Sequence, residues 1–208
     1  MWDIRVKNNF DKLSYSYDNT HLQSGSPKYY IEERRRECLM QMLRNRHKKV
    51  LDAGCGTGFY SKILSDEDFY FGIDISKNMI TCCRQKGIEN TFVGTYEYLP
   101  FKDGIFDTVI CINAFQYTKK PVEALTEMSR VLKPDGEIII TFQNWMSPRN
   151  IIQVFRVLFK KKRGDIEHER SLYTIFRLHK LFAMTDLKMI EVIGINFLPF
   201  RSDHKKRI

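Results

Sequence analysis

Three glycines and two aspartates in the first third of the chain have the spacing of a nucleoside-binding turn. Gly54, Gly56 and Gly58 occupy alternate positions after a short apolar run, and glycine lets the backbone turn tightly and approach a ligand. Asp52 precedes the first glycine, and Asp74 ends the next apolar run, sixteen residues after the last glycine. An acid at the tip of a second strand is placed to accept the two hydroxyls of a ribose. A plain strand-to-helix turn does not need three glycines, so the pattern favours a nucleoside site.

The elements that must position these residues alternate between strands and helices. We expect strands at 48–52, 69–74, 91–94, 106–112 and 136–143, and helices at 57–65, 76–86 and 121–132. This alternation predicts an α/β fold, a Rossmann-like, doubly wound and mostly parallel sheet with helices on both faces. The glycine spacing differs from that of dinucleotide-binding proteins, because no third glycine is set deeper for a pyrophosphate.

The N-terminal part is less regular. Residues 1–25 read as a mobile segment or as a short helix around 10–17. Ser26 and Pro27 have the types that cap and open a helix, which we expect to run to about Arg46.

The C-terminal part is expected to contain two more helices and a sixth strand. The helices are predicted at 148–163 and about 171–184, and the strand at about 187–195. Because residues 201–208 are almost wholly polar, we expect six strands in parallel order and a seventh strand that is missing or rudimentary.

Four segments of the chain resemble the class I S-adenosylmethionine (SAM) dependent methyltransferases. They are the glycine turn at 50–58, the ribose-acid motif at 72–76, the lead into a fourth strand at 97–101 and 106–110, and the helix, turn and fifth strand at 127–141. The match spans about residues 48–142 in order and spacing. It is most similar to the branch that contains the ubiquinone/menaquinone C-methyltransferases and many small-molecule methyltransferases.

The length of 208 residues predicts a single domain, which with the resemblance is a methyltransferase domain over residues 1–208. Residues 1–47 would form an N-terminal helical cap or lid, 48–143 the SAM-binding core, and 144–208 an acceptor-side insert with the last strand.

The resemblance also implies roles for residues around the glycine turn. The backbone of Gly54, Cys55 and Gly56 would face the methionine and ribose parts of SAM. Asp52 would support the turn or reach the amino group through water, and Asp74 would hold the ribose hydroxyls. The alternative for Asp74 is a helix cap ahead of residue 76.

Other cofactor contacts follow from the resemblance less directly. Ile75 would pack on the adenine. Relatives often carry an aspartate at the position of Thr95, so its hydroxyl or the backbone of Tyr96 would have to read the adenine amino group here. Asn113, together with Phe115, is expected to line the methyl-donor pocket, with a core position as the alternative for Phe115.

Two tyrosines near the N-terminus are candidates for a lid. Tyr15 and Tyr17 lie in a Ser-Tyr-Ser-Tyr-Asp segment similar to a Tyr-Asp pair that often closes over the cofactor in this family. The alternative is a tyrosine packed on the first helix.

No residue spacing identifies a catalytic base. Methyl transfer from a sulfonium is an in-line displacement, for which the protein must orient donor and acceptor and exclude water. A general base is needed only if the acceptor must lose a proton. The candidates are His21, His168 and Gln116, and Gln116 also lies where it would line the pocket. No metal ligand set is expected.

The formal charge of +9 is spread over several basic clusters. These are 34–36, 44–49, 160–163 and 205–207. Such a surface favours RNA, an anionic membrane or an acidic substrate as partner, and simple solubility is the alternative.

The predicted helix at 148–163 combines a wide apolar arc with basic residues at its edge. This pattern suits a peripheral contact with an anionic membrane or a cover over an apolar acceptor pocket. Ordinary packing on the sheet is the alternative.

The cysteines and the apolar runs indicate a reduced cytoplasmic protein. Five cysteines are odd in number and form no Cys-x-x-Cys pair, so neither a metal site nor a disulfide framework is expected. No run of 18 apolar residues occurs, and the N-terminus has no apolar signal region.

Together these patterns predict a SAM-dependent methyltransferase that acts on a small or lipid-like molecule. One alternative is a tRNA-modifying methyltransferase, although no RNA-binding module is recognisable. The other is a non-catalytic SAM-binding partner subunit. The acceptor and the oligomeric state stay open.

Overall fold

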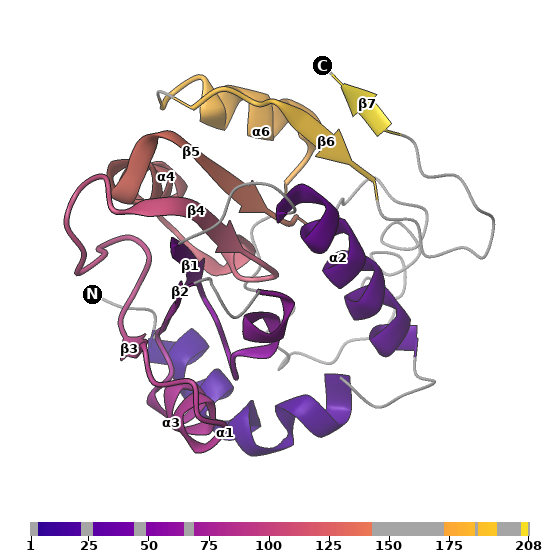
Figure 1. The fold of residues 1–208 in the computed structure, drawn as a ribbon, viewed down its shortest axis with the longest axis vertical. Coiled ribbons are helices and arrows are strands. Elements are labelled where there is room, and N and C mark those ends of the chain that lie inside the picture. The colour runs from indigo at the N-terminus through magenta and orange to yellow at the C-terminus, as the bar shows by residue number, and fades with distance from the viewer. Residues whose placement is uncertain are drawn as a thin grey trace.

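A five-stranded parallel sheet forms the centre of the protein (Figure 1). The computed structural model describes residues 4–21, 27–43, 49–64, 69–142, 173–185, 187–194 and 205–207. The strands follow the order β3-β2-β1-β4-β5, and every neighbouring pair is parallel. They are β1 (Lys49–Ala53), β2 (Phe69–Asp74), β3 (Thr91–Val93), β4 (Phe106–Cys111) and β5 (Leu132–Ile140). The predicted Rossmann-like α/β fold is confirmed.

Helices cover both faces of this sheet. They are α1 (Ile4–His21), α2 (Pro27–Leu43), α3 (Lys77–Gln85), α4 (Pro121–Val131) and α6 (Ile175–Phe182), with short 3₁₀ helices η1 (Phe59–Ile63) and η2 (Phe115–Tyr117). On β1, Leu51 packs in a core cluster with Leu125 of α4, whereas its neighbour Val50 packs in a second cluster with Leu39 of α2. Successive side chains of a strand point to opposite faces, so both faces need apolar residues.

The order of the strands creates a crevice beside β1. The chain leaves β1 towards β2 and β3 on one side, then returns to β4 and β5 on the other. At such a switch point the connections diverge, and ligands of open α/β sheets bind outside the carboxyl ends of the strands. The turn after β1 and the loop after β4 therefore border the same space.

Two connections differ in detail from the predicted elements. The helix expected at 57–65 is a 3₁₀ helix of five residues, and it begins after Gly58, whose φ of 77° is left-handed. β5 begins at Leu132, and its register with β4 jumps from Leu132 to Glu137. The predicted turn at 133–136 is thus a bulge within β5, directly after α4.

The sixth strand lies within its predicted range, but its predicted place in the parallel sheet is wrong, and a short seventh strand is present. β6 (Glu191–Ile193) pairs with β7 (Lys205–Arg207) in a separate antiparallel ladder, and within the described residues it has no place in the parallel sheet. A strand ladder is made by backbone groups, and charged side chains are common on exposed edge strands. The polar composition of residues 201–208 therefore did not exclude a seventh strand.

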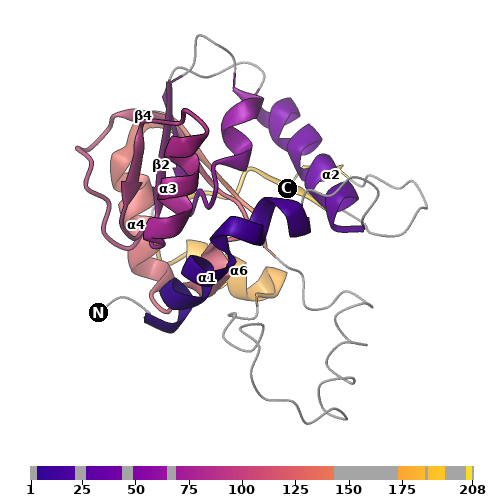
Figure 2. The same ribbon diagram turned by 90° about the horizontal axis from the view of Figure 1, so that it is seen from below.

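The N-terminal residues form a longer helix than the sequence indicates. α1 contains 18 residues and lies beside α3 (Figure 2). Asp11 anchors it, because one carboxylate oxygen accepts hydrogen bonds from Ser76 Oγ at 2.6 Å and from the Asn78 N–H at 3.3 Å. Asn78 Nδ2 donates in turn to the Asp11 carbonyl oxygen at 3.0 Å. Ser76 caps α3, so the carboxylate lies at the positive end of that helix.

Several expected elements lie wholly or partly outside the described residues. The helix predicted at 148–163 lies wholly outside them. The helix expected to run to residue 46 is described as far as residue 43, where α2 ends. The division of the chain into cap, core and insert stays a prediction. No helix within the described residues combines the length and apolar character that a membrane span requires.

We expect Asp11→Ala to lower the free energy of unfolding by about 1–2 kcal/mol, because the donors of Ser76 and Asn78 lose their acceptor. Urea denaturation measures this change. Glu37→Ala is the control, since it removes an exposed ion pair with Arg34 on α2 and should change stability by less than about 0.5 kcal/mol. Equal effects of the two substitutions would contradict an anchoring role for Asp11.

Candidate cofactor site

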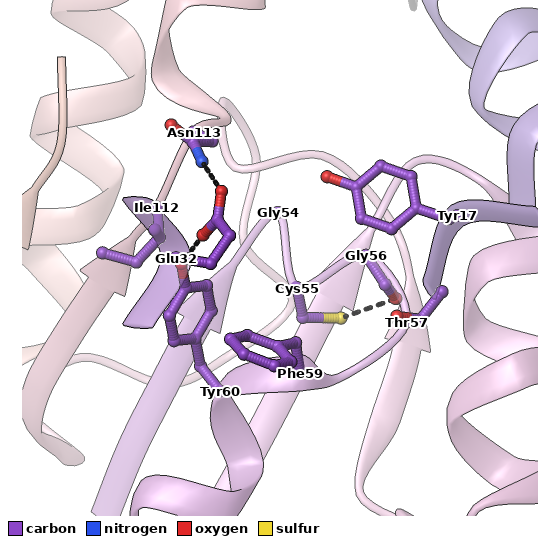
Figure 3. A pocket seen from close by; sticks show the side chains of 10 residues that line it. All are labelled: Tyr17, Glu32, Gly54, Cys55, Gly56, Thr57, Phe59, Tyr60, Ile112 and Asn113. Carbon is purple, nitrogen blue, oxygen red and sulfur yellow. Dashed lines mark hydrogen bonds between the residues drawn. The ribbon is translucent and has the colours of Figure 1, made fainter. Parts of the chain in front are cut away.

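A pocket lies at the carboxyl end of β1, where two loops and two helices meet (Figure 3). Its lining residues are Tyr17, Glu32, Gly54, Cys55, Gly56, Thr57, Phe59, Tyr60, Ile112 and Asn113. The empty space within it is about 460 Å³, including the solvent at its mouth.

The glycine turn forms the floor of the pocket. The N–H groups of Gly54 and Cys55 donate to the Ile73 carbonyl oxygen at 2.8 and 3.1 Å, which ties the turn to β2. At Gly54 φ is 89°, and an added Cβ would lie 2.3 Å from the Cβ of Ala114. At Gly56 φ is 54°, and an added Cβ would meet nothing within 4 Å. The first glycine permits close packing against the loop after β4, and the second leaves the pocket side of the turn open.

Asp74 joins the end of β2 to the glycine turn. Its Oδ2 accepts the Gly56 N–H at 2.9 Å, and its Oδ1 accepts the Ser76 N–H at 2.8 Å. Burial raises the pKa of this carboxyl to about 6, against the lowering effect of the two backbone hydrogen bonds. Each oxygen of a carboxylate can accept a second hydrogen bond, so Asp74 can hold the turn and still receive hydroxyl groups.

Asp52 is a buried acid with one unused oxygen. It is 1% exposed, and its Oδ2 accepts the hydroxyl of Tyr70 at 2.9 Å. Its Oδ1 has no hydrogen-bond partner among the described residues. Burial raises the pKa of Asp52 to about 7. An orphaned buried acceptor directly before the glycine turn is suited to a water molecule or a cationic group of a ligand.

Only one of the two candidate lid tyrosines reaches the pocket. Tyr17 lines it from α1, on the side opposite to Glu32, whereas Tyr15 is 70% exposed (Figure 3). Residues two positions apart on a helix point about 200° away from each other, so both could not face the site.

The end of α1 is also tied to the glycine turn. Thr57 Oγ1 donates to Asp18 at 2.6 Å, and Lys86 forms an ion pair with Asp18. Lys86 Nζ donates to the Thr57 carbonyl oxygen at 2.9 Å.

The loop after β4 is held in an unusual backbone conformation. Asn113 has a φ of 56°, in the left-handed region. Its N–H donates to Thr141 Oγ1 at 2.9 Å, its Nδ2 to Glu32 Oε1 at 3.2 Å, and Gln116 Nε2 donates to its carbonyl oxygen at 3.1 Å. Asn113 lines the pocket as predicted, and Gln116 is buried behind it without lining the pocket. Phe115 is fully buried in the core beside Phe142.

The predicted adenine contacts lie further from the pocket. Tyr96 donates to the Ala114 carbonyl oxygen at 3.0 Å, and its ring lies beside Gly54. Thr95 Oγ1 accepts the Glu97 N–H at 3.3 Å. Neither Thr95 nor Tyr96 lines the pocket, and neither does Ile75, which is partly buried directly after β2.

The histidine candidates are not tested by the structure. His21 is the last residue of α1, and the position of its side chain is not described. His168 lies outside the described residues.

Glu32 is the pocket residue that sequence reasoning missed most clearly. Its Oε2 accepts the Tyr60 hydroxyl at 2.6 Å, and its Oε1 accepts from Asn113 and from Arg35. It lies in the run Glu-Glu-Arg-Arg-Arg-Glu, which reads as a solvated helix face. Thr57, Phe59, Tyr60 and Ile112 were missed as well, although their closeness to the glycine turn or to the end of β4 was a usable signal.

Asp52 should make the stability of the ligand-free protein depend on pH. Between about pH 4 and 7 the folded protein keeps a proton that the unfolded chain releases, so the free energy of unfolding falls as pH rises through this window. The substitution Asp52→Asn removes the titrating carboxyl and with it this fall in the free energy of unfolding. Urea denaturation gives the free energy of unfolding of both proteins. We expect the difference, variant minus unsubstituted protein, to be greater at pH 8 than at pH 5. Parallel stability profiles would contradict the raised pKa.

Comparisons with known proteins identify methyltransferases as relatives of this chain. A methyltransferase domain family matches residues 51–140. An uncharacterised protein of Methanocaldococcus jannaschii is 32% identical over 170 residues, covering 81% of this chain and 64% of that protein. The ubiquinone/menaquinone biosynthesis C-methyltransferase of Wigglesworthia glossinidia brevipalpis is 31% identical over 147 residues, covering 65% of this chain and 58% of that protein. The chain thus spans about three fifths of the length of these two relatives.

A solved structure shows the same fold over nearly the whole chain. The magnesium protoporphyrin IX methyltransferase of Synechocystis, solved with bound S-adenosylhomocysteine (SAH), has a TM-score of 0.74 at 16% identity, and the match covers 93% of each chain. The matching segments, the fold and these relatives lead to one assignment. Residues 51–140 match a methyltransferase domain, and the chain has the fold of the class I SAM-dependent methyltransferases.

Proposed function

We propose that this protein transfers the methyl group of SAM to a small or lipid-like organic molecule in the cytoplasm. One observation carries the proposal: the glycine turn and the loop after β4 line one pocket at the carboxyl end of the sheet. This is where ligands of such sheets bind. Asp74 does not line this pocket but holds the glycine turn through the Gly56 N–H.

The residues at the site fit SAM, the cofactor of the family. Asp74 has free acceptor capacity for ribose hydroxyls, and the open space at Gly56 permits close approach of a ligand to the backbone. The unpartnered Oδ1 of Asp52 fits the amino group, either directly or through water. Bound SAM supplies an activated methyl group, so the protein has to orient the two reactants and exclude water.

The walls of the pocket support an organic acceptor with apolar character. Phe59, Tyr60 and Ile112 line it from the sheet side, and Tyr17 lines it from α1. The name of one relative, a ubiquinone/menaquinone biosynthesis C-methyltransferase, points to quinone precursors as a class to test. The apolar and basic pattern at 148–163 adds support from the sequence, outside the described residues.

The basic cluster at 34–36 gives little support to an RNA substrate. On α2, each of its three arginines forms an ion pair with a glutamate three residues away. The pairs are Arg34 with Glu37, Arg35 with Glu32, and Arg36 with Glu33. Arginines that are neutralised within their own helix contribute less to phosphate binding than free ones.

A methyl-transfer screen separates these possibilities. Purified protein is incubated with methyl-labelled SAM and, in turn, with quinone precursors, lipids in anionic vesicles and tRNA. We expect transfer to an organic acceptor from the first two classes. Transfer to tRNA alone would replace this proposal by the RNA-modifying alternative. Binding of SAM without transfer to any acceptor would favour a non-catalytic partner subunit. Titration calorimetry that detects NAD but not SAM would contradict the whole proposal.

Asp74 should make SAM affinity depend on pH. Only the ionised carboxylate accepts two hydroxyls with full strength, and burial raises the pKa of Asp74 to about 6, so affinity should rise as pH increases from 5 to 7. In Asp74→Asn this rise should be flatter, and affinity at pH 8 should fall at least about tenfold. Calorimetry measures both changes, and circular dichroism checks the fold. Unchanged affinity would place the ribose elsewhere.

A further inference from the structure

We infer that Glu32 makes the pocket prefer SAM over its demethylated product SAH. The inference rests on the proposed function, because it concerns the cofactor in this pocket. It assigns a specificity role to a residue of the N-terminal helices, far in the sequence from the glycine turn.

Glu32 is the only charged residue among the described residues that line the pocket. Its side chain is 14% exposed, so its charge is only partly screened by water. Tyr60 fixes one carboxylate oxygen and Asn113 the other, from two different walls of the pocket (Figure 3). The carboxylate is therefore held in place before any ligand binds.

The counter-charge of Glu32 lies away from the pocket. Arg35 Nη1 is 2.5 Å from Glu32 Oε1, one helical turn along α2, and Arg35 does not line the pocket. The pair thus presents its negative end to the pocket. An acid so placed attracts a cation more strongly than a neutral group of the same shape.

SAM and SAH differ in this pocket by one methyl group and one positive charge. The acceptor's electron pair forms a bond to the methyl carbon while the bond between that carbon and sulfur breaks, and the electron pair of the broken bond stays on sulfur. The sulfonium becomes a neutral thioether, while the ammonium and carboxylate groups of the ligand are unchanged. The fixed negative charge of Glu32 therefore binds the sulfonium of SAM more tightly than the neutral thioether of SAH. The attraction is lost when the methyl group is transferred, which helps a new SAM molecule to displace SAH.

A purely structural role for Glu32 makes a different prediction. If the carboxylate only ties α2 to Tyr60 and Asn113, its loss should weaken both ligands by the same factor. The ratio of the two affinities therefore separates a charge effect from a structural one.

The test compares Glu32→Gln with a matched control. Glu33→Gln removes the adjacent acid, which pairs with Arg36 three residues along the same helix and does not line the pocket. Titration calorimetry with SAM and with SAH gives the two dissociation constants. We expect Glu32→Gln to weaken SAM binding roughly five- to tenfold and SAH binding less than about twofold, as a partly screened charge allows. Glu33→Gln should change neither.

A second variant tests the opposite sign. Arg35→Gln removes the counter-charge and leaves Glu32 in place, so it should increase the preference for SAM over SAH. This variant keeps the inference testable if Glu32→Gln fails to fold by circular dichroism.

Four outcomes would overturn the inference. Equal loss of SAM and SAH binding in Glu32→Gln would show a structural tie only, and unchanged binding of both would show no role. A lower preference for SAM in Arg35→Gln would show that the pair does not act through its charge. If the unsubstituted protein binds neither ligand, the proposed function fails and the inference fails with it.

Discussion

The site depends on the close approach of the turn after β1 to its two neighbours. β1 is the central strand, so this turn must pass between the end of β2 and the loop after β4. Hydrogen bonds to the Ile73 carbonyl oxygen and to Asp74 hold it on the first side. On the other side, the space at Gly54 is too small for any side chain, because Ala114 lies against it. Glycine is the residue that satisfies both constraints with a left-handed φ.

The N-terminal helices are attached to this turn mainly by polar contacts. Asp18 of α1 accepts from Thr57, and Glu32 of α2 accepts from Tyr60 and Asn113. The sheet is held instead by fully buried apolar side chains. Polar and partly exposed contacts open at a lower free energy than a packed core. α2 is also held on the sheet by the buried side chains of Leu39 and Leu43, so only its polar contacts at the pocket belong to this weaker class.

Two acids next to the glycine turn oppose the stability of the ligand-free protein. Burial raises the pKa of Asp52 to about 7 and that of Asp74 to about 6, so ionising either one costs free energy before a ligand binds. A ligand that offers hydroxyl or cationic groups relieves part of this cost. The arrangement trades stability of the empty protein for affinity towards a cationic nucleoside.

The sequence by itself determined the parallel sheet, the glycine turn and the placement of Asp74, because strand periodicity, glycine conformation and the position of an acid after a strand are local properties. It left Phe115 between core and pocket, did not separate Tyr15 from Tyr17, and did not identify Glu32 as a site residue. Only the tertiary structure decided the positions of these side chains. Phe115 packs on Phe142, and Glu32 contacts Tyr60, 28 residues away in the sequence, and Asn113, 81 residues away. Contacts over such separations depend on how helices dock on the sheet, which no local pattern encodes.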